Sequence, residues 1–169
     1  MLRFTKKTES GRSMIEIIGV LAIMAIISAA AFVLIRSAMA TQRRNQVVND
    51  FMNIASGVRT LFADYDNLET VADLNSDDIF GAIGVDPDNT PYKNCKYSVT
   101  LDNSDNTYQT FTVWIFGTNT GASNLPARDC LALKSMNWPG AVSGAADSAS
   151  VCSGADSTEA HYVGVKYKK

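Results

Sequence analysis

The chain is poor in the residues from which most catalytic and metal sites are built. Its 169 residues include one histidine, His161, and three cysteines without a C-x-x-C pair. The usual zinc sites need four such ligands at short spacings. No G-x-S-x-G, H-E-x-x-H or phosphate-binding glycine loop occurs either. We therefore predict no enzyme, no catalytic residue, no cofactor and no metal site, and we assign His161 to the surface or to a strand.

Proline is missing from a long stretch near the start of the sequence: none of the four prolines falls between Arg12 and Asp86. Proline breaks helices, so its absence leaves a long helix uninterrupted. Apolar residues recur there three and four positions apart, the spacing of one helix face. They are Val47, Phe51, Ile54, Val58, Leu61 and Tyr65. The pattern predicts one helix over residues 14–65, with its second half packed on a globular domain.

Charge is missing from residues 17–35, a run of 19 residues. A bilayer's hydrocarbon layer is about 30 Å thick and takes about 20 apolar residues as a helix, so the run is long enough to span a membrane. Glu16 stands directly before the run, and a basic head precedes both, as on the cytoplasmic side of a membrane span (Arg3, Lys6 and Lys7). Secretory signals have their small-residue cleavage site after the apolar core, whereas here the small residue Gly11 lies before it.

These residues resemble a known family. Gly11, four further residues, Glu16 and then the apolar run resemble the start of a type IV prepilin, and the type IVb pilins are the most similar in character. The resemblance implies that a prepilin peptidase removes residues 1–11 as a leader and that Arg12 becomes the N-methylated first residue. It also implies that Glu16 pairs with the terminal amine of a neighbouring subunit during assembly. The family's first mature residue is usually apolar, and Arg12 departs from that pattern.

By the same resemblance, residues 12–36 form the transmembrane helix and later the filament core, and residues 37–169 form a globular head. The expected fold class is α+β, with the long helix packed through its C-terminal half on an antiparallel sheet. A short helix is expected from Ser76, ended by Gly81 and Gly84.

The sheet is expected to contain at least three strands. Alternating apolar residues predict an antiparallel hairpin of residues 96–101 and 108–116, and a closing strand over residues 161–167. A further short helix is expected over residues 129–136. Residues 141–160 are built from Ala, Ser, Gly and Asp and are expected to lie on the surface, because they can bury little.

The three cysteines, Cys95, Cys130 and Cys152, allow three disulfide pairings. In an exported domain the default is one disulfide and one leftover thiol. We favour Cys130–Cys152, because it ties down the low-complexity loop between residues 130 and 152 and stabilises by about 3 kcal/mol in the chain-entropy model. Pilins also have a disulfide near the C-terminus that bounds a variable surface segment. Cys95 remains a possible partner for either of the other two.

The resemblance implies a structural role for the chain. A single-pass precursor in the inner membrane of a bacterium is trimmed and assembled into an extracellular helical homopolymer, a pilus. The implied partners are further copies of the chain, the membrane before assembly, prepilin peptidase and the inner-membrane pilus assembly machinery. Such filaments serve adhesion, aggregation, motility, DNA uptake or conjugation, and the sequence does not select one of these.

Charge and two other interpretations complete the expectations. Without residues 1–11 the chain has 12 basic and 16 acidic side chains and no basic cluster, so we expect no specific nucleic-acid partner. The first alternative is a minor pilin or a pseudopilin of a type II secretion machine. The second is a signal-anchored periplasmic domain that binds a ligand or catalyses a reaction.

Overall fold

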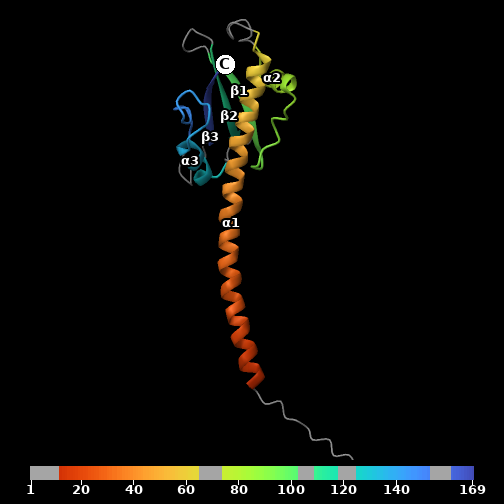
Figure 1. Cartoon of the computed structure of the whole chain (residues 1–169), viewed down its shortest axis with the longest axis vertical. Coiled ribbons are helices and arrows are strands. Elements are labelled where there is room, and N and C mark those ends of the chain that lie inside the picture. Colours follow the sequence, from red (N-terminus) through yellow and green to blue (C-terminus); the bar gives the residue numbers. More distant parts are fainter. Residues whose placement is uncertain (1–11, 65–73, 103–108, 118–124, 153–160) are drawn as a thin grey trace, which may run out of the picture. The chain divides into compact units, whose positions relative to one another are not determined.

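The computed structural model describes residues 12–64, 74–102, 109–117, 125–152 and 161–169. Its elements follow the order α1 (Arg12–Leu61), α2 (Ser76–Ile83), β1 (Cys95–Asp102), β2 (Thr110–Gly117), α3 (Ala127–Ser135) and β3 (Tyr162–Lys168) (Figure 1). The chain divides into two compact units, Met1–Thr41 and Gln42–Lys169, and α1 contributes to both. We call residues 14–35 of α1 the apolar segment and the second unit the head. The fold class is α+β, as predicted.

Within the head, α1 buries the predicted apolar stripe. Val47, Phe51, Ile54 and Val58 are almost fully buried. Their spacing of three and four residues puts them on one face of the helix, and that face packs on the sheet. The helix ends at Leu61, four residues before the predicted end, and Tyr65 lies outside the described residues.

The sheet has three antiparallel strands in the order β1-β2-β3. Val99 of β1 lies opposite Val113 of β2, and Val113 lies opposite Val165 of β3. These three residues point into the core, while their neighbours in the next row (Ser98, Trp114 and Gly164) point to the other face of the sheet. The predicted hairpin and closing strand are therefore confirmed, with bounds shifted by one or two residues.

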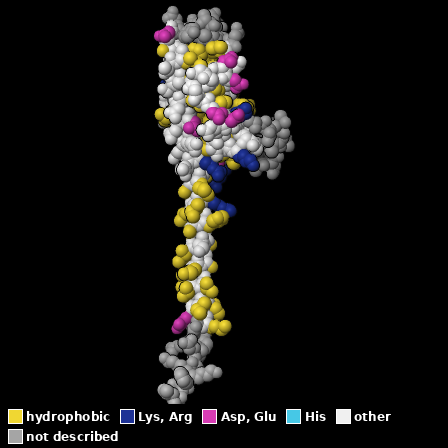
Figure 2. All heavy atoms as spheres, turned by 90° about the vertical axis from the view of Figure 1, so that its right-hand side faces the viewer, with side chains coloured by type: hydrophobic (Ala, Val, Ile, Leu, Met, Phe, Trp, Pro, Cys, Tyr) yellow, Lys and Arg dark blue, Asp and Glu magenta, His cyan; other side chains and the backbone are white. Residues whose placement is uncertain are grey.

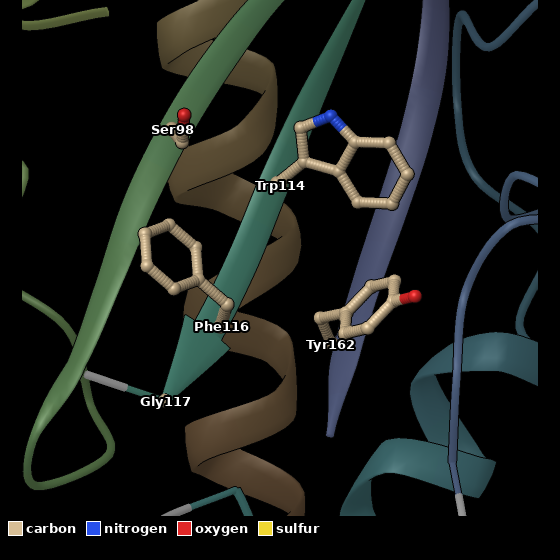
Figure 3. Close-up of a pocket in the computed structure, with 5 residues that line it drawn as sticks. All are labelled: Ser98, Trp114, Phe116, Gly117 and Tyr162. Carbon is tan, nitrogen blue, oxygen red and sulfur yellow. The ribbon is translucent and has the colours of Figure 1, made fainter. Parts of the chain in front are cut away.

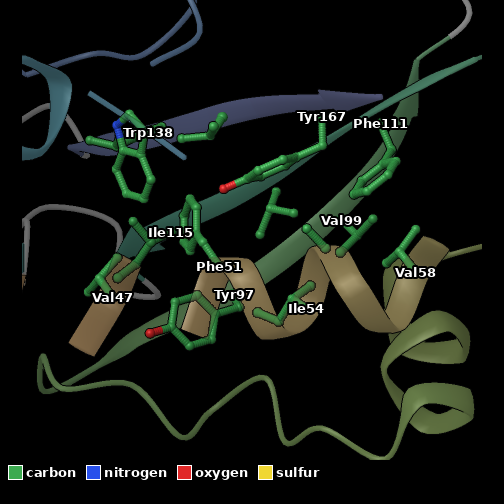
Figure 4. Packing of buried hydrophobic residues seen from close by; sticks show 14 of the residues in the cluster. Val47, Phe51, Ile54, Val58, Tyr97, Val99, Phe111, Ile115, Trp138 and Tyr167 are labelled. Carbon is green, nitrogen blue, oxygen red and sulfur yellow. The ribbon is translucent and has the colours of Figure 1, made fainter. Parts of the chain in front are cut away.

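Aromatic rings join α1 to the sheet (Figure 4). Phe51 meets the ring of Tyr97 edge-on, with 5.8 Å between centroids, and stacks on Trp138 at 5.0 Å. Trp138 is fully buried, and its indole Nε1 donates a hydrogen bond to the carbonyl of Leu133 (3.0 Å). Burying an aliphatic or aromatic side chain of this kind stabilises by about 1.5–3 kcal/mol, so this layer is a main source of the head's stability.

The outer edge of β1 is covered by the chain that precedes it. The amide of Tyr97 donates to the carbonyl of Pro87 (2.9 Å), and the amide of Val99 donates to the hydroxyl of Ser76 at the start of α2 (3.0 Å). Unpaired strand edges are templates for association with other chains. The connection between α1 and the sheet thus closes one edge.

The outer edge of β3 is covered by residues 141–152, which lie mostly on the surface, as predicted, and also pair with the strand. Ala141 and Val151 form β-bridges with Tyr167 and Tyr162, and the amide of Asp147 donates to the carbonyl of Gly164 (2.7 Å). Small side chains allow this backbone to approach the strand closely. The segment is a cover for the sheet, and residues 153–160 of the predicted loop lie outside the described residues.

Local details of the two short helices also differ from expectation. The N-cap of α2 is Asn75, whose side chain accepts a hydrogen bond from the amide of Asp78 (2.9 Å). Gly81 lies inside α2, and the helix ends at Gly84 in the left-handed conformation (φ 69°) that glycine adopts without strain. The helix α3 begins and ends one or two residues before the predicted positions.

Candidate functional site

The apolar segment is the largest exposed apolar feature of the first unit. Its large side chains are exposed in the isolated chain, with Ile15 at 75% and Ile26 at 72%. Figure 2 shows these hydrophobic side chains in yellow along the helix. Solvated apolar surface of this extent is unfavourable by about 25 cal/mol per Å², so the segment requires another apolar environment.

The segment has the length and composition of a membrane span. Within the described residues, α1 is the one helix long and apolar enough to cross a bilayer, with a mean hydropathy of 2.8 in its most apolar window. Glu16 and Arg36 mark the two ends of its uncharged run. The guanidinium of Arg36 lies over the ring of Phe32, 4.2 Å from the centroid, in a cation–π contact at the second end.

The predicted processing and assembly residues lie at the start of this helix. Gly11 lies outside the described residues, and Arg12 is the first residue of α1. Glu16 is exposed on α1, one turn after Arg12, and is followed directly by the uncharged run. The structure thus puts a carboxylate at the first end of the apolar segment, open to contact by another molecule.

The predicted disulfide Cys130–Cys152 is present, with 5.6 Å between the two Cα atoms. It joins α3 to the segment that covers β3. Around it, Lys134 Nζ donates to the carbonyl of Ser150 (2.5 Å), and the Ser150 hydroxyl accepts from the amide of Gly164 (3.0 Å). The bridge therefore closes a loop that is also held by side-chain hydrogen bonds.

The third cysteine and the lone histidine are buried. Burial raises the pKa of the Cys95 thiol to about 11, so the thiol is protonated and unreactive at neutral pH. His161 lies just before β3 and is 4% exposed, so its assignment to the surface was wrong. Its Nδ1 donates to the carbonyl of Leu125 (2.8 Å), which identifies a structural role between distant parts of the chain.

A shallow groove of about 310 Å³ lies on the face of the sheet opposite α1 (Figure 3). Trp114, Phe116 and Tyr162 line it, together with Ser98 and Gly117. The indole Nε1 of Trp114 donates to the hydroxyl of Thr100 (2.8 Å), and Tyr162 meets the Trp114 ring edge-on at 5.8 Å. The alternation of residues in β2 could have placed Trp114 and Phe116 on one face. Among the described residues its lining holds no carboxylate, imidazole or thiol, and the phenol of Tyr162 is its titratable group.

A second groove, of about 380 Å³, is polar and lies beside α1 in the head. Its lining is made of α1 residues, the turn after α2 and a tyrosine of β1: Asp50, Asn53, Gly84, Val85, Asp86, Asn89 and Tyr97. The phenol of Tyr97 donates to Asp50 Oδ2 (2.7 Å). Burial and this carboxylate raise the pKa of Tyr97. We call this cavity the polar groove; it joins residues far apart in sequence and was not predicted.

An ion pair connects α1 to α3, with Asp129 buried and Arg44 partly exposed. Arg44 Nε lies 3.6 Å from Asp129 Oδ1, and Asp129 is 7% exposed. Burial, followed by the negative charge of Asp129, raises the pKa of the neighbouring Tyr92. Removing one partner of such a pair leaves a buried charge uncompensated and destabilises strongly. The pair is part of the scaffold that holds α3 and its cysteine in place.

The described residues expose an apolar helix surface and two grooves. In the described part of the chain no group of three or more His, Cys, Asp or Glu side chains could hold a metal ion. The apolar segment provides the exposed apolar surface, with Glu16 near its start. Neither a protein-family model, nor a curated protein, nor a solved structure matches this chain.

Proposed function

We propose that this chain is the structural subunit of a type IV pilus: a prepilin cut after Gly11, N-methylated on Arg12 and polymerised into an extracellular filament. The observation that carries the proposal is the composition of α1. The second half of the helix buries one face in the head, and the first half exposes about twenty apolar residues that no described residue covers.

The physical argument requires two successive environments for the apolar segment. Lipid can cover it while the precursor is in the inner membrane. Outside the membrane, the apolar segments of other copies of the chain can cover it, because they are equally apolar and have the same length. A bundle of these helices buries the surface that a single copy exposes, which makes polymerisation the favourable state.

Glu16 is proposed to fix the axial register of neighbouring subunits. Apolar packing alone allows helices to slide, whereas a carboxylate in a helix bundle is costly unless a cation meets it. The terminal amine of Arg12 in a neighbouring copy supplies that cation. Only one axial offset satisfies both charges, so the pair selects one helical arrangement.

Substitution of Glu16 tests this role. Glu16→Ala is expected to leave a processed, membrane-inserted protein and to lower filament yield at least tenfold, because the register contact is lost. Glu16→Gln keeps the shape without the charge and is expected to do the same. Electron microscopy of sheared cell surfaces gives the yield. Abundant normal filaments from Glu16→Gln would refute a charge-based role for this residue.

The proposed partners follow from the same account: further copies of the chain, prepilin peptidase, the inner-membrane assembly machinery and the membrane before assembly. The mass of the mature N-terminal peptide tests processing. We expect it to begin with a methylated Arg12. A chain that begins with Met1, or one cut after Ile35, would instead indicate a signal anchor or a secretory signal.

A further inference from the structure

The polar groove of the head carries negative charge. Two of its lining residues are aspartates, Asp50 and Asp86, and none is basic. Asp50 is half-buried and accepts one hydrogen bond from Tyr97, and Asp86 is exposed and accepts one from the amide of Asp88 (2.9 Å). Within the described residues neither carboxylate forms an ion pair. A groove lined by one half-buried and one exposed carboxylate favours a cationic group.

An exposed arginine on the same helix has the complementary character. Arg43 lies on the surface and forms no ion pair with any described residue, whereas the adjacent Arg44 is paired with Asp129. Arg43 precedes Asp50 by seven residues, or two turns of helix. The two residues therefore lie on the same face of α1, about 10.5 Å apart along the axis.

We propose that the polar groove binds the Arg43 guanidinium of a second copy of the chain. The proposal rests on the proposed function, because anchored or polymerised copies are parallel. A parallel copy displaced by seven residues, about 10.5 Å along α1, brings its Arg43 level with Asp50 of the first. At this offset Arg43 of one copy meets the groove of the other without the reverse contact, so the contact is heterologous, and repeated addition of copies yields an open helical assembly.

Two other occupants of the groove are less well supported. The groove has two carboxylates, and among the described residues no group of three or more His, Cys, Asp or Glu side chains could hold a metal ion. Arg36 precedes Asp50 by fourteen residues, which is also a multiple of seven, but its guanidinium already packs on the ring of Phe32, 4.2 Å from the centroid. Arg43 is the arginine at this spacing without such a contact among the described residues.

Zero-length crosslinking tests the contact directly. Arg43→Lys introduces an amine, which a carbodiimide joins to a carboxylate in contact with it. Full-length chain is co-produced in isotope-labelled and unlabelled forms, and the reaction is run on membranes and on sheared filaments. We expect a mixed-label peptide pair that joins position 43 to Asp50 or Asp86. The wild-type chain is the matched control, because a guanidinium does not form this crosslink.

Charge reversal tests the effect on assembly. Arg43→Glu is expected to lower filament yield at least tenfold, and adding Asp86→Arg in the same chain is expected to restore it to within threefold of wild type. Arg128→Glu reverses another exposed arginine, which lies in α3, and is expected to leave the yield within twofold. The unfolding midpoint of each variant shows whether its head is folded.

The outcomes separate this contact from the proposed function. Wild-type chain that forms no filament contradicts the proposed function, while the crosslink in membranes still reports on contact between copies. The contact itself is overturned if position 43 forms no crosslink between copies, if it joins carboxylates other than Asp50 and Asp86, or if Arg43→Glu assembles normally. A crosslink found only with Arg36→Lys also overturns it, because that requires an offset of fourteen residues.

Discussion

Reduction of the Cys130–Cys152 bridge is expected to destabilise the head by about 3 kcal/mol. The bridge closes a loop with a sequence separation of 22 residues. In the chain-entropy model, opening a loop of this length releases about 11 cal/mol/K in the unfolded chain, which is about 3 kcal/mol at 25 °C. The hydrogen bonds of residues 141–152 to β3 exist with or without the bridge, so they do not enter this difference.

The assay is urea unfolding of the full-length chain in detergent, followed by tryptophan fluorescence. Trp138 is fully buried against Phe51, so its emission changes when the head unfolds. For an m-value of about 1–3 kcal/mol/M, the loss corresponds to a midpoint lower by about 1–3 M. Reduction by dithiothreitol and the double variant Cys130→Ala/Cys152→Ala should give similar losses.

Cys95→Ala is the matched control, because it removes the third thiol and leaves the bridge in place. The free energy of unfolding of this variant should still be about 3 kcal/mol higher in the oxidised form than in the reduced form. A loss below about 1 kcal/mol in every comparison would refute the reasoning. It would mean that the unfolded chain keeps this loop closed by residual structure.

Two further predictions concern the sheet and its buried ionisable groups. Gly164→Ala should lower the free energy of unfolding in urea by about 1–3 kcal/mol, because the new Cβ would lie 2.8 Å from Cδ2 of Trp114. This loss should be smaller in a Trp114→Ala background, and an equal loss in both backgrounds would contradict the contact. Alkaline pH should destabilise the head between about pH 9 and 12, because burial raises the folded-state pKa values of Cys95 to about 11 and of Tyr167 to about 12, and also raises those of Tyr92 and Tyr97. The unfolded chain loses these protons at lower pH than the folded head. The free energy of unfolding is therefore unchanged below the pKa values of the unfolded chain, and above them it falls by up to about 1.4 kcal/mol per pH unit for each group. Phenolate absorbance that rises gradually with pH, without cooperative unfolding, would contradict this.

Local and periodic features of the fold were predictable from the sequence. A proline-free stretch with apolar residues three and four apart gave α1, whose buried face contains Val47, Phe51, Ile54 and Val58 as expected. The alternation of apolar and polar residues predicted the strands, because side chains of a half-buried strand point alternately to the two faces of the sheet. Loop closure and the family resemblance together favoured Cys130–Cys152, which the structure contains.

Features that depend on contacts between distant backbone segments were not predictable. Residues 141–152 lie mostly on the surface, as their composition indicated, but their pairing with β3 was missed, because composition carries no information on such bonds. His161 is buried because it bonds to Leu125, 36 residues away. The polar groove likewise joins Asp50 of α1 to the turn that contains Asp86, and only the fold brings them together.

The most direct test of the account is the composition of surface filaments on cells that produce this chain. Filaments are sheared, examined by electron microscopy with antibodies to the head, and analysed by mass spectrometry. The account predicts filaments labelled along their length, made mainly of this chain and beginning with methylated Arg12. A chain that keeps Met1 and stays in the membrane fraction as a monomer, with no labelled filament, would contradict it.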